Sequence, residues 1–85
     1  MPNIKSAKKR LRQSRKRRDR NRAVRSEIRT RTKVLLETEV AGEAEEAYRG
    51  ITSLLDTAAR KGIISKQAAA RRKSRLGRYV RRLGD

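Results

Sequence analysis

The sequence predicts an all-α protein, a three-helix bundle with an extended basic first helix. Three observations favour this class. Strand formers are sparse and no run alternates with period two, while Ala, Leu, Lys, Arg, Gln and Glu dominate the chain. Three apolar stripes with helical spacing are separated by two short breaks. The only proline is Pro2, so nothing later in the chain is of the type that interrupts helices.

The first helix is expected over about residues 5–40, which at 1.5 Å per residue would be about 54 Å long. Between Lys5 and Arg22 the only aliphatic residues are Ala7 and Leu11, so this part has no apolar face to bury. Residues 1–22 are therefore predicted to be a basic arm, and residues 23–85 the bundle. After residue 22 the first helix has an apolar stripe that comprises Val24, Ile28, Leu35, Leu36 and Val40. Thr32 also lies at a position of this stripe.

Like charges oppose the arm's folding as an isolated helix. Seven pairs of Lys or Arg lie four residues apart between Lys5 and Lys33, against two attractive pairs, Arg15–Asp19 and Glu27–Arg31. The seven repulsive pairs disfavour an isolated helix by roughly 1.5–3.5 kcal/mol. We therefore expect residues 1–22 to be frayed in the free protein and to become helical on a nucleic acid.

The second helix is expected over about residues 43–61, after a break at Ala41-Gly42. Glu43, Glu45 and Glu46 lie at its start, where a helix favours negative charge. Its stripe has the clearest helical period of the three and comprises Ala44, Ala47, Tyr48, Ile51, Leu54, Leu55, Ala58 and Ala59.

The third helix is expected over about residues 66–83. It follows Arg60-Lys61-Gly62, in which two bases in a last turn precede a glycine suited to a left-handed stop. Ser65 can then cap the new helix at its N-terminus. Three stripes joined by short turns can cover one another as a bundle. The third stripe comprises Ala69, Leu76, Tyr79, Val80 and Leu83.

The charge is distributed very unevenly along the 85 residues. Residues 1–33 hold 15 bases and two acids, residues 34–62 hold three bases and six acids, and residues 63–85 hold eight bases and one acid. The net charge is +17. So much like charge in one small domain indicates a polyanionic partner, and nucleic acid is the interpretation that we favour.

The residue types that are absent argue against catalysis. Without cysteine or histidine, the chain lacks thiolate and imidazole ligands and the usual general base at neutral pH. Serines therefore have no histidine to activate them. We expect no enzyme activity, cofactor, metal site or small-molecule substrate. A cluster of acids is interpreted as the solvated end of the bundle and comprises Glu37, Glu39, Glu43, Glu45 and Glu46.

The two aromatic residues, Tyr48 and Tyr79, lie on apolar stripes. We expect them to pack in the core with exposed hydroxyls and not to stack on bases. We therefore expect the chain to bind the backbone and shape of folded RNA or of a duplex, because recognition of single strands usually needs aromatic faces. Ser6, Ser14 and Ser74, which lie among bases, are interpreted as further hydrogen-bond donors to phosphate.

Two other functions fit the sequence less well. An architectural protein that compacts nucleoid DNA is less favoured, because apolar wedges and a dimer seam are lacking. A helix lying on an anionic membrane would need an apolar face on residues 5–22, which is absent. The start of the chain has no apolar h-region, and runs such as Val34-Leu35-Leu36 are too short to span a bilayer. We expect a cytoplasmic protein without a signal peptide or a membrane partner.

Two segments resemble a known family closely. The opening Asn3-Ile4-Lys5-Ser6-Ala7-Lys8-Lys9-Arg10 and the turn Lys61-Gly62-Ile63-Ile64 are similar to the bacterial small-subunit ribosomal protein numbered twenty. The chain has Ser65-Lys66-Gln67 where the family often has His-Lys-Asn. Further similar positions are Gln13-Ser14, Arg20-Asn21, Ser26, Arg29-Thr30, Lys33, Asp56, Ala58-Ala59, Lys66, Ala69-Ala70-Arg71 and Lys73-Ser74-Arg75-Leu76.

The resemblance implies a non-enzymatic, structural constituent of the small ribosomal subunit. It implies direct binding to small-subunit ribosomal RNA at the 5′ domain and at the long stem near the 3′ end, with few protein contacts. Carried over by position, the RNA contacts would be Lys5, Ser6, Lys8, Lys9, Arg10, Gln13, Ser14, Arg20, Asn21, Arg29, Thr30 and Lys33 in the first helix, and Lys66, Arg71, Lys73 and Arg75 in the third.

Overall fold

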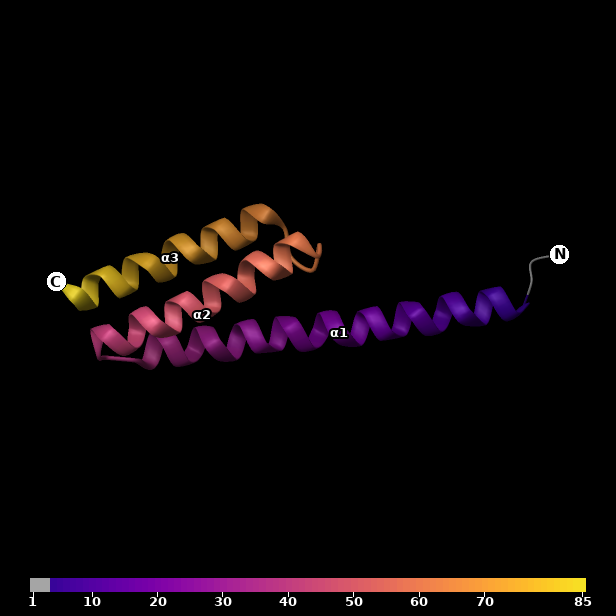
Figure 1. The fold of residues 1–85 in the computed structure, drawn as a ribbon, viewed down its shortest axis with the longest axis horizontal. Helices are drawn as coiled ribbons and strands as arrows, with labels where there is room; N and C mark the ends of the chain where they lie inside the picture. The colour runs from indigo at the N-terminus through magenta and orange to yellow at the C-terminus, as the bar shows by residue number, and fades with distance from the viewer. Residues whose placement is uncertain (1–3) are drawn as a thin grey trace.

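The computed structural model describes residues 4–85 and consists of three helices (Figure 1). They are α1 (Ile4–Glu37), α2 (Ala41–Arg60) and α3 (Lys66–Gly84), and residues 4–85 include no strand. The expected all-α fold with a long first helix is confirmed. Expectations that rest on residues 1–3, such as the start of the family-like octet, lie outside the described residues.

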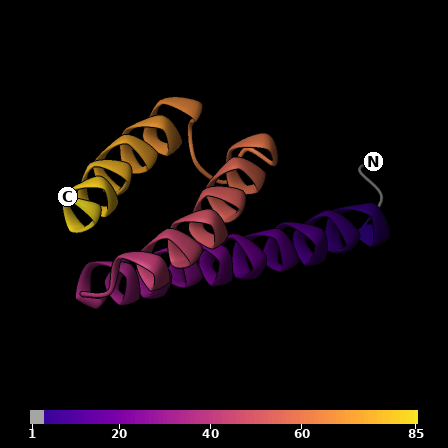
Figure 2. The same cartoon turned by 60° about the vertical axis from the view of Figure 1, so that its left-hand side comes forward.

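Helix α2 is the centre of the bundle. It packs against α1 on one side and against α3 on the other, whereas α1 and α3 contact each other much less. Successive helices run in opposite directions, and the N-terminal half of α1 projects beyond the other two helices (Figures 1 and 2). The two most basic helices are therefore joined mainly through α2.

The core is small and wholly apolar. Its largest fully buried side chains are Ile28 and Leu35 from α1 and Ile51 and Leu55 from α2. Burial of side chains of this size contributes about 1.5–3 kcal/mol each. The remaining buried residues are Ala44, Ala58, Ile63, Ala69, Leu76 and Val80.

The molecule is much longer than a compact domain of its size. Its extents are 66 × 20 × 13 Å and its radius of gyration is 17.4 Å, whereas a compact chain of this length has a radius of about 12 Å. Every residue from Ile4 to Arg20 is exposed. The arm therefore adds surface without adding to the core.

The connection between α1 and α2 lies earlier than the sequence suggested. We expected the break at Ala41-Gly42, but both residues already belong to α2, and the turn spans residues 38–40. The Thr38 amide donates to the Leu35 carbonyl at 3.1 Å, and Val40 adopts an extended conformation from which α2 begins. A glycine in the first turn of a helix is tolerated, so Gly42 did not mark the boundary.

The turn between α2 and α3 forms as predicted. Gly62 has φ of +76°, the left-handed conformation that glycine adopts without steric cost. The Gly62 amide donates to Ala59 at 3.1 Å and the Ile63 amide donates to Ala58 at 2.9 Å, which is the Schellman pattern. The Ser65 hydroxyl accepts from the Ala68 amide at 3.0 Å and caps α3, as expected.

The predicted stripes of α2 and α3 are confirmed, but that of α1 is only partly correct. Ile28 and Leu35 are buried and Val24 packs against the core. Leu36 is 49% exposed and Val40 is 57% exposed, so neither completes the stripe. Leu36 is turned 100° from Leu35 around the helix, and Val40 lies in the turn.

Both tyrosines join neighbouring helices through their hydroxyls. The Tyr48 hydroxyl donates to the Lys73 carbonyl of α3 at 3.0 Å. The Tyr79 hydroxyl lies 3.0 Å from the Leu36 carbonyl and 2.8 Å from the Thr38 carbonyl, where α1 ends. Leu36 lies in the last turn of α1, where backbone carbonyls lack partners within the helix, so Tyr79 caps α1 from α3. The rings pack as expected, but the hydroxyls bind backbone and are not left to water.

We predict that Gly77→Ala destabilises the bundle by about 1 kcal/mol, although alanine is the better helix former. A Cβ at position 77 would lie 2.9 Å from the Tyr48 hydroxyl oxygen, so the Tyr48–Lys73 hydrogen bond would be displaced. Urea unfolding measures the change. The control is Gly77→Ala in a Tyr48→Phe background, where the substitution should stabilise. Equal stabilisation in both backgrounds would contradict the proposed contact.

Candidate nucleic-acid interface

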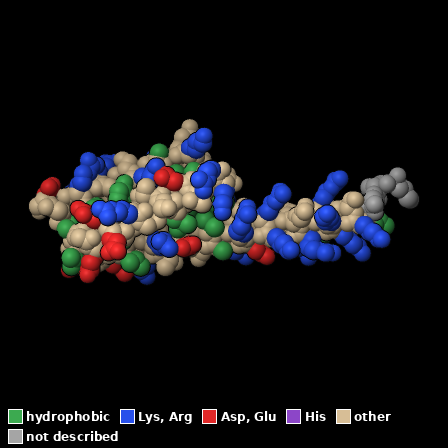
Figure 3. Space-filling model, in the orientation of Figure 1, with side chains coloured by type: hydrophobic (Ala, Val, Ile, Leu, Met, Phe, Trp, Pro, Cys, Tyr) green, Lys and Arg blue, Asp and Glu red, His purple; other side chains and the backbone are tan. Residues whose placement is uncertain are grey.

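The projecting half of α1 is basic on every side. Successive helical residues turn by 100°, so a run this rich in Lys and Arg directs cations all around the axis. Basic side chains line both visible edges of the arm in Figure 3. All eight predicted contacts before residue 21 are exposed there, namely Lys5, Ser6, Lys8, Lys9, Arg10, Gln13, Ser14 and Arg20.

The first residue of the projecting helix to be partly covered is Asn21, another predicted contact. Its Oδ1 atom is buried and has no hydrogen-bond partner. That oxygen therefore faces the protein, and RNA could reach it only if the side chain rotated. Asn21 lies where the arm meets the bundle.

Three predicted contacts lie on α1 alongside the bundle. Arg29, Thr30 and Lys33 are all exposed. The Thr30 hydroxyl donates to the Ser26 carbonyl at 3.0 Å, so its proton is already used inside the helix. Arg29 and Lys33 are therefore better placed than Thr30 to donate to a phosphate.

Helix α3 carries a second basic surface. Three of the predicted contacts on this helix, Lys66, Arg71 and Arg75, are exposed. Lys73 is turned toward α2, where its ammonium lies 2.7 Å from an Asp56 carboxylate oxygen. The arrangement keeps Lys73 partly neutralised, so the outer face of α3 depends on its arginines.

Two arginines that were not among the predicted contacts lie on the same face. Arg78 and Arg82 are exposed and lie seven and eleven residues after Arg71, which places both on the same side of the helix. The signal was present in the sequence as helical spacing. The predicted contacts follow the resemblance to the family, which does not include these two positions.

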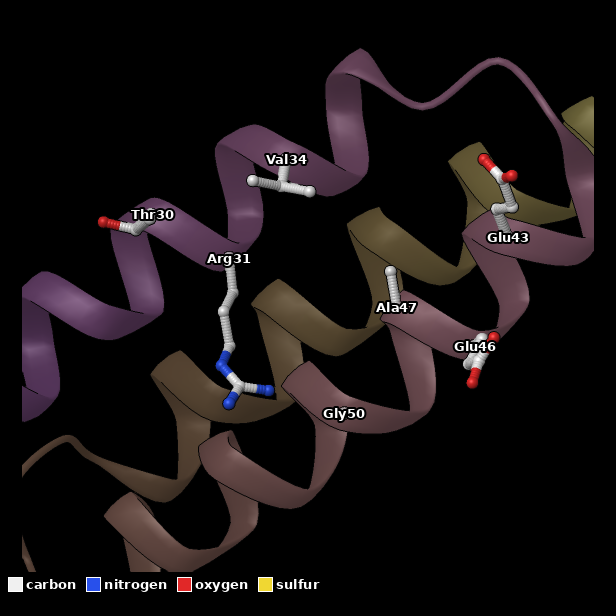
Figure 4. A pocket seen from close by; sticks show the side chains of 7 residues that line it. All are labelled: Thr30, Arg31, Val34, Glu43, Glu46, Ala47 and Gly50. Atoms are coloured by element: carbon white, nitrogen blue, oxygen red, sulfur yellow. The ribbon is translucent and has the colours of Figure 1, made fainter.

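The acidic cluster lies at the end of the bundle away from the arm. Its five glutamates are exposed, and in Figure 3 acidic side chains gather over that end. A groove of about 360 Å³ opens nearby between α1 and α2. Figure 4 shows Arg31 reaching from α1 toward Gly50, with Glu43 and Glu46 on the α2 side. The Arg31 guanidinium is already paired with Glu27 at 3.0 Å, so this groove does not favour a polyanion.

The described residues include neither a metal site nor a membrane-spanning helix. Within residues 4–85, no group of three or more His, Cys, Asp or Glu side chains could hold a metal ion. No helix in that range is both long enough and apolar enough to cross a membrane.

A small helical protein with two exposed cationic surfaces belongs to the class of proteins that bind polyanions. The model of the family described as ribosomal protein S20 matches residues 2–81. The chain is 55% identical over 80 residues to the small ribosomal subunit protein bS20 of Gemmatimonas aurantiaca, covering 94% of each chain. It is 52% identical over 85 residues to that of Kosmotoga olearia, covering 95% of this chain and 87% of that protein.

The chain therefore belongs to the ribosomal protein S20 family. Members of this family are structural proteins of the ribosome and not enzymes, so the expectation of a non-enzymatic function is confirmed. The expected location, the small ribosomal subunit in the cytoplasm, follows from the same membership.

We predict that Asp56→Asn changes the stability of the bundle by less than about 1 kcal/mol, because its partly exposed pair with Lys73 is screened by water. The substitution releases the Lys73 ammonium, so the protein should elute from heparin at higher salt. Urea unfolding and heparin chromatography measure the two effects. Earlier elution, or a large loss of stability, would mean that the pair has a structural function.

Proposed function

We propose that the protein binds small-subunit ribosomal RNA directly, through two basic surfaces carried by different helices. The arm of α1 binds one RNA element and the outer face of α3 binds another. The resemblance to the family points to the 5′ domain and to the long stem near the 3′ end, with few protein contacts. The observation that carries the proposal is that exposed bases occupy both α1 and α3, which are joined mainly through α2.

The arm suits a site that RNA surrounds. Its bases point in every direction and none of its side chains from Ile4 to Arg20 is buried. Lys and Arg that neutralise phosphates release counterions, which is the main source of affinity for nucleic acid. RNA, and not burial in the bundle, therefore stabilises the arm's helix.

The surface on α3 suits contact on one side only. Its apolar stripe packs on α2, so only its outer row of arginines is available. The planar guanidinium fork matches the geometry of phosphate oxygens. Such contacts fix position without reading sequence, and binding by the shape of a folded RNA is the expected mode.

Because the arm is continuous with the part of α1 that packs on the bundle, RNA that orders the arm joins the two surfaces into a clamp. Once the arm is bound, α3 is held near its own RNA element, and binding of α3 becomes intramolecular. By thermodynamic reciprocity, each RNA element then favours the position of the other. In this way a protein without catalytic groups stabilises the packing of RNA during assembly.

We predict that replacing Arg71 and Arg75 by Ala lowers affinity for small-subunit RNA on the order of tenfold. The slope of log K against log salt, expected near −6 to −7 for about eight phosphate contacts, should become shallower by about 1.4–1.8. The matched control replaces Arg49 and Arg60, two exposed bases of α2, by Ala. Filter binding at several salt concentrations measures both. If the two double variants show the same affinity and the same salt slope, the α3 surface is not a binding site. Competition with duplex DNA tests whether the protein prefers RNA.

We also predict that the arm is frayed without RNA, because like charges repel along it and none of its side chains is buried. Amide hydrogen exchange should be fast from Lys8 to Arg20 in the free protein and slow at Leu55 in the core. Addition of small-subunit RNA should slow exchange along the arm. Protection of the free arm equal to that of Leu55 would refute this prediction.

A further inference from the structure

A third cluster of cations lies where the arm meets the bundle. A groove of about 310 Å³ opens there and is lined by Arg25, Ile28 and Arg29 of α1, Ile64 of the second turn and Arg72 of α3. Three of its five lining residues are arginines and none is an acid. It is the one groove among those described whose lining residues come from both basic helices.

Arg25 is held in place by the fold. Its guanidinium donates a hydrogen bond of 3.1 Å to the Ile63 carbonyl, in the turn shaped by the left-handed Gly62. A carbonyl carries no net charge, so Arg25 keeps its full positive charge toward the groove. Because the side chain is already ordered, less conformational entropy is lost when a ligand binds.

The acids that form ion pairs in the bundle do not neutralise the arginines of this groove. Glu27 pairs with Arg31 and Asp56 pairs with Lys73. Arg29 and Arg72 are exposed and can turn toward an anion that enters. Two helices that each carry a positive charge to one groove repel each other there, and an anion between them would relieve that repulsion.

We propose that this groove binds the sugar–phosphate backbone of RNA, an inference that rests on the proposed function. Phosphate oxygens accept hydrogen bonds from Arg29 and Arg72, while the fixed charge of Arg25 attracts the phosphate. The half-buried Ile64 offers an apolar face to the ribose. A single RNA segment bound in this groove contacts both α1 and α3. The groove therefore connects the two basic surfaces at the point where the arm joins the bundle.

The first test compares Arg72→Gln with Arg49→Gln, an exposed arginine of α2 outside the groove. Both variants lose one charge, and Arg72 and Arg49 are both exposed, so neither change removes core packing. In filter binding with small-subunit RNA, Arg72→Gln should make the salt slope shallower by about 0.7–0.9 and Arg49→Gln should leave it nearly unchanged. Equal slopes for the two variants, with normal binding by the wild type, would overturn the inference alone. Failure of the wild type to bind would overturn the proposed function.

The second test needs no RNA. Exchanging chloride for inorganic pyrophosphate at constant ionic strength should raise the melting temperature of the wild type, because an anion that binds only the folded groove stabilises it. Arg72→Gln should lose about half of this rise or more, and Arg49→Gln should keep it. Arg72→Lys, which retains the charge without the fork, should lie between them. The same rise in all variants would show general screening of charge and would exclude a built phosphate site.

Discussion

Burial of the two faces of α2 is the interaction on which the rest of the structure depends. Ile51 and Leu55 are fully buried in a core that also includes residues of α1 and α3, and those two helices contact each other much less than either contacts α2. Both outer helices are strongly basic, so without α2 their charges would drive them apart. The apolar stripe of α2 therefore does more than fill the core, because it also fixes the spacing between two cationic surfaces.

The fold separates what stabilises the protein from what the RNA requires. The buried residues are all apolar and lie on the faces that meet within the bundle, whereas most of the bases are on the exposed faces. The polar contacts between helices join groups that could otherwise be left unpaired: Tyr79 caps the end of α1, and Arg25 donates to the turn before α3. Each contact also sets the position of a basic helix. Stability and RNA affinity can thus be altered largely independently by substitution.

Much of this architecture follows from local sequence. Helical spacing predicts the stripe of α2, Gly62 predicts the stop and Ser65 predicts the cap, because each depends on residues close in the chain. The position of the first turn, the exposure of Leu36 and the pairing of Lys73 with Asp56 were not predicted. They depend on how far each helix is rotated against its neighbour, which periodicity does not determine. The groove at Arg25 escaped notice for the same reason, since its residues come from three separate segments.

Because α1 is one continuous helix, its packing in the bundle fixes the direction in which each side chain of the projecting half points. Ile28 and Leu35 anchor the helix in the core, so every side chain toward the N-terminus points in a direction fixed by its distance from them. One residue inserted near Asn21 would turn everything before it by 100° and shift it by 1.5 Å. In an amphipathic helix such a change would misdirect the binding face. Here it would substitute one set of cations for another, so the attraction to RNA would survive while the individual contacts changed.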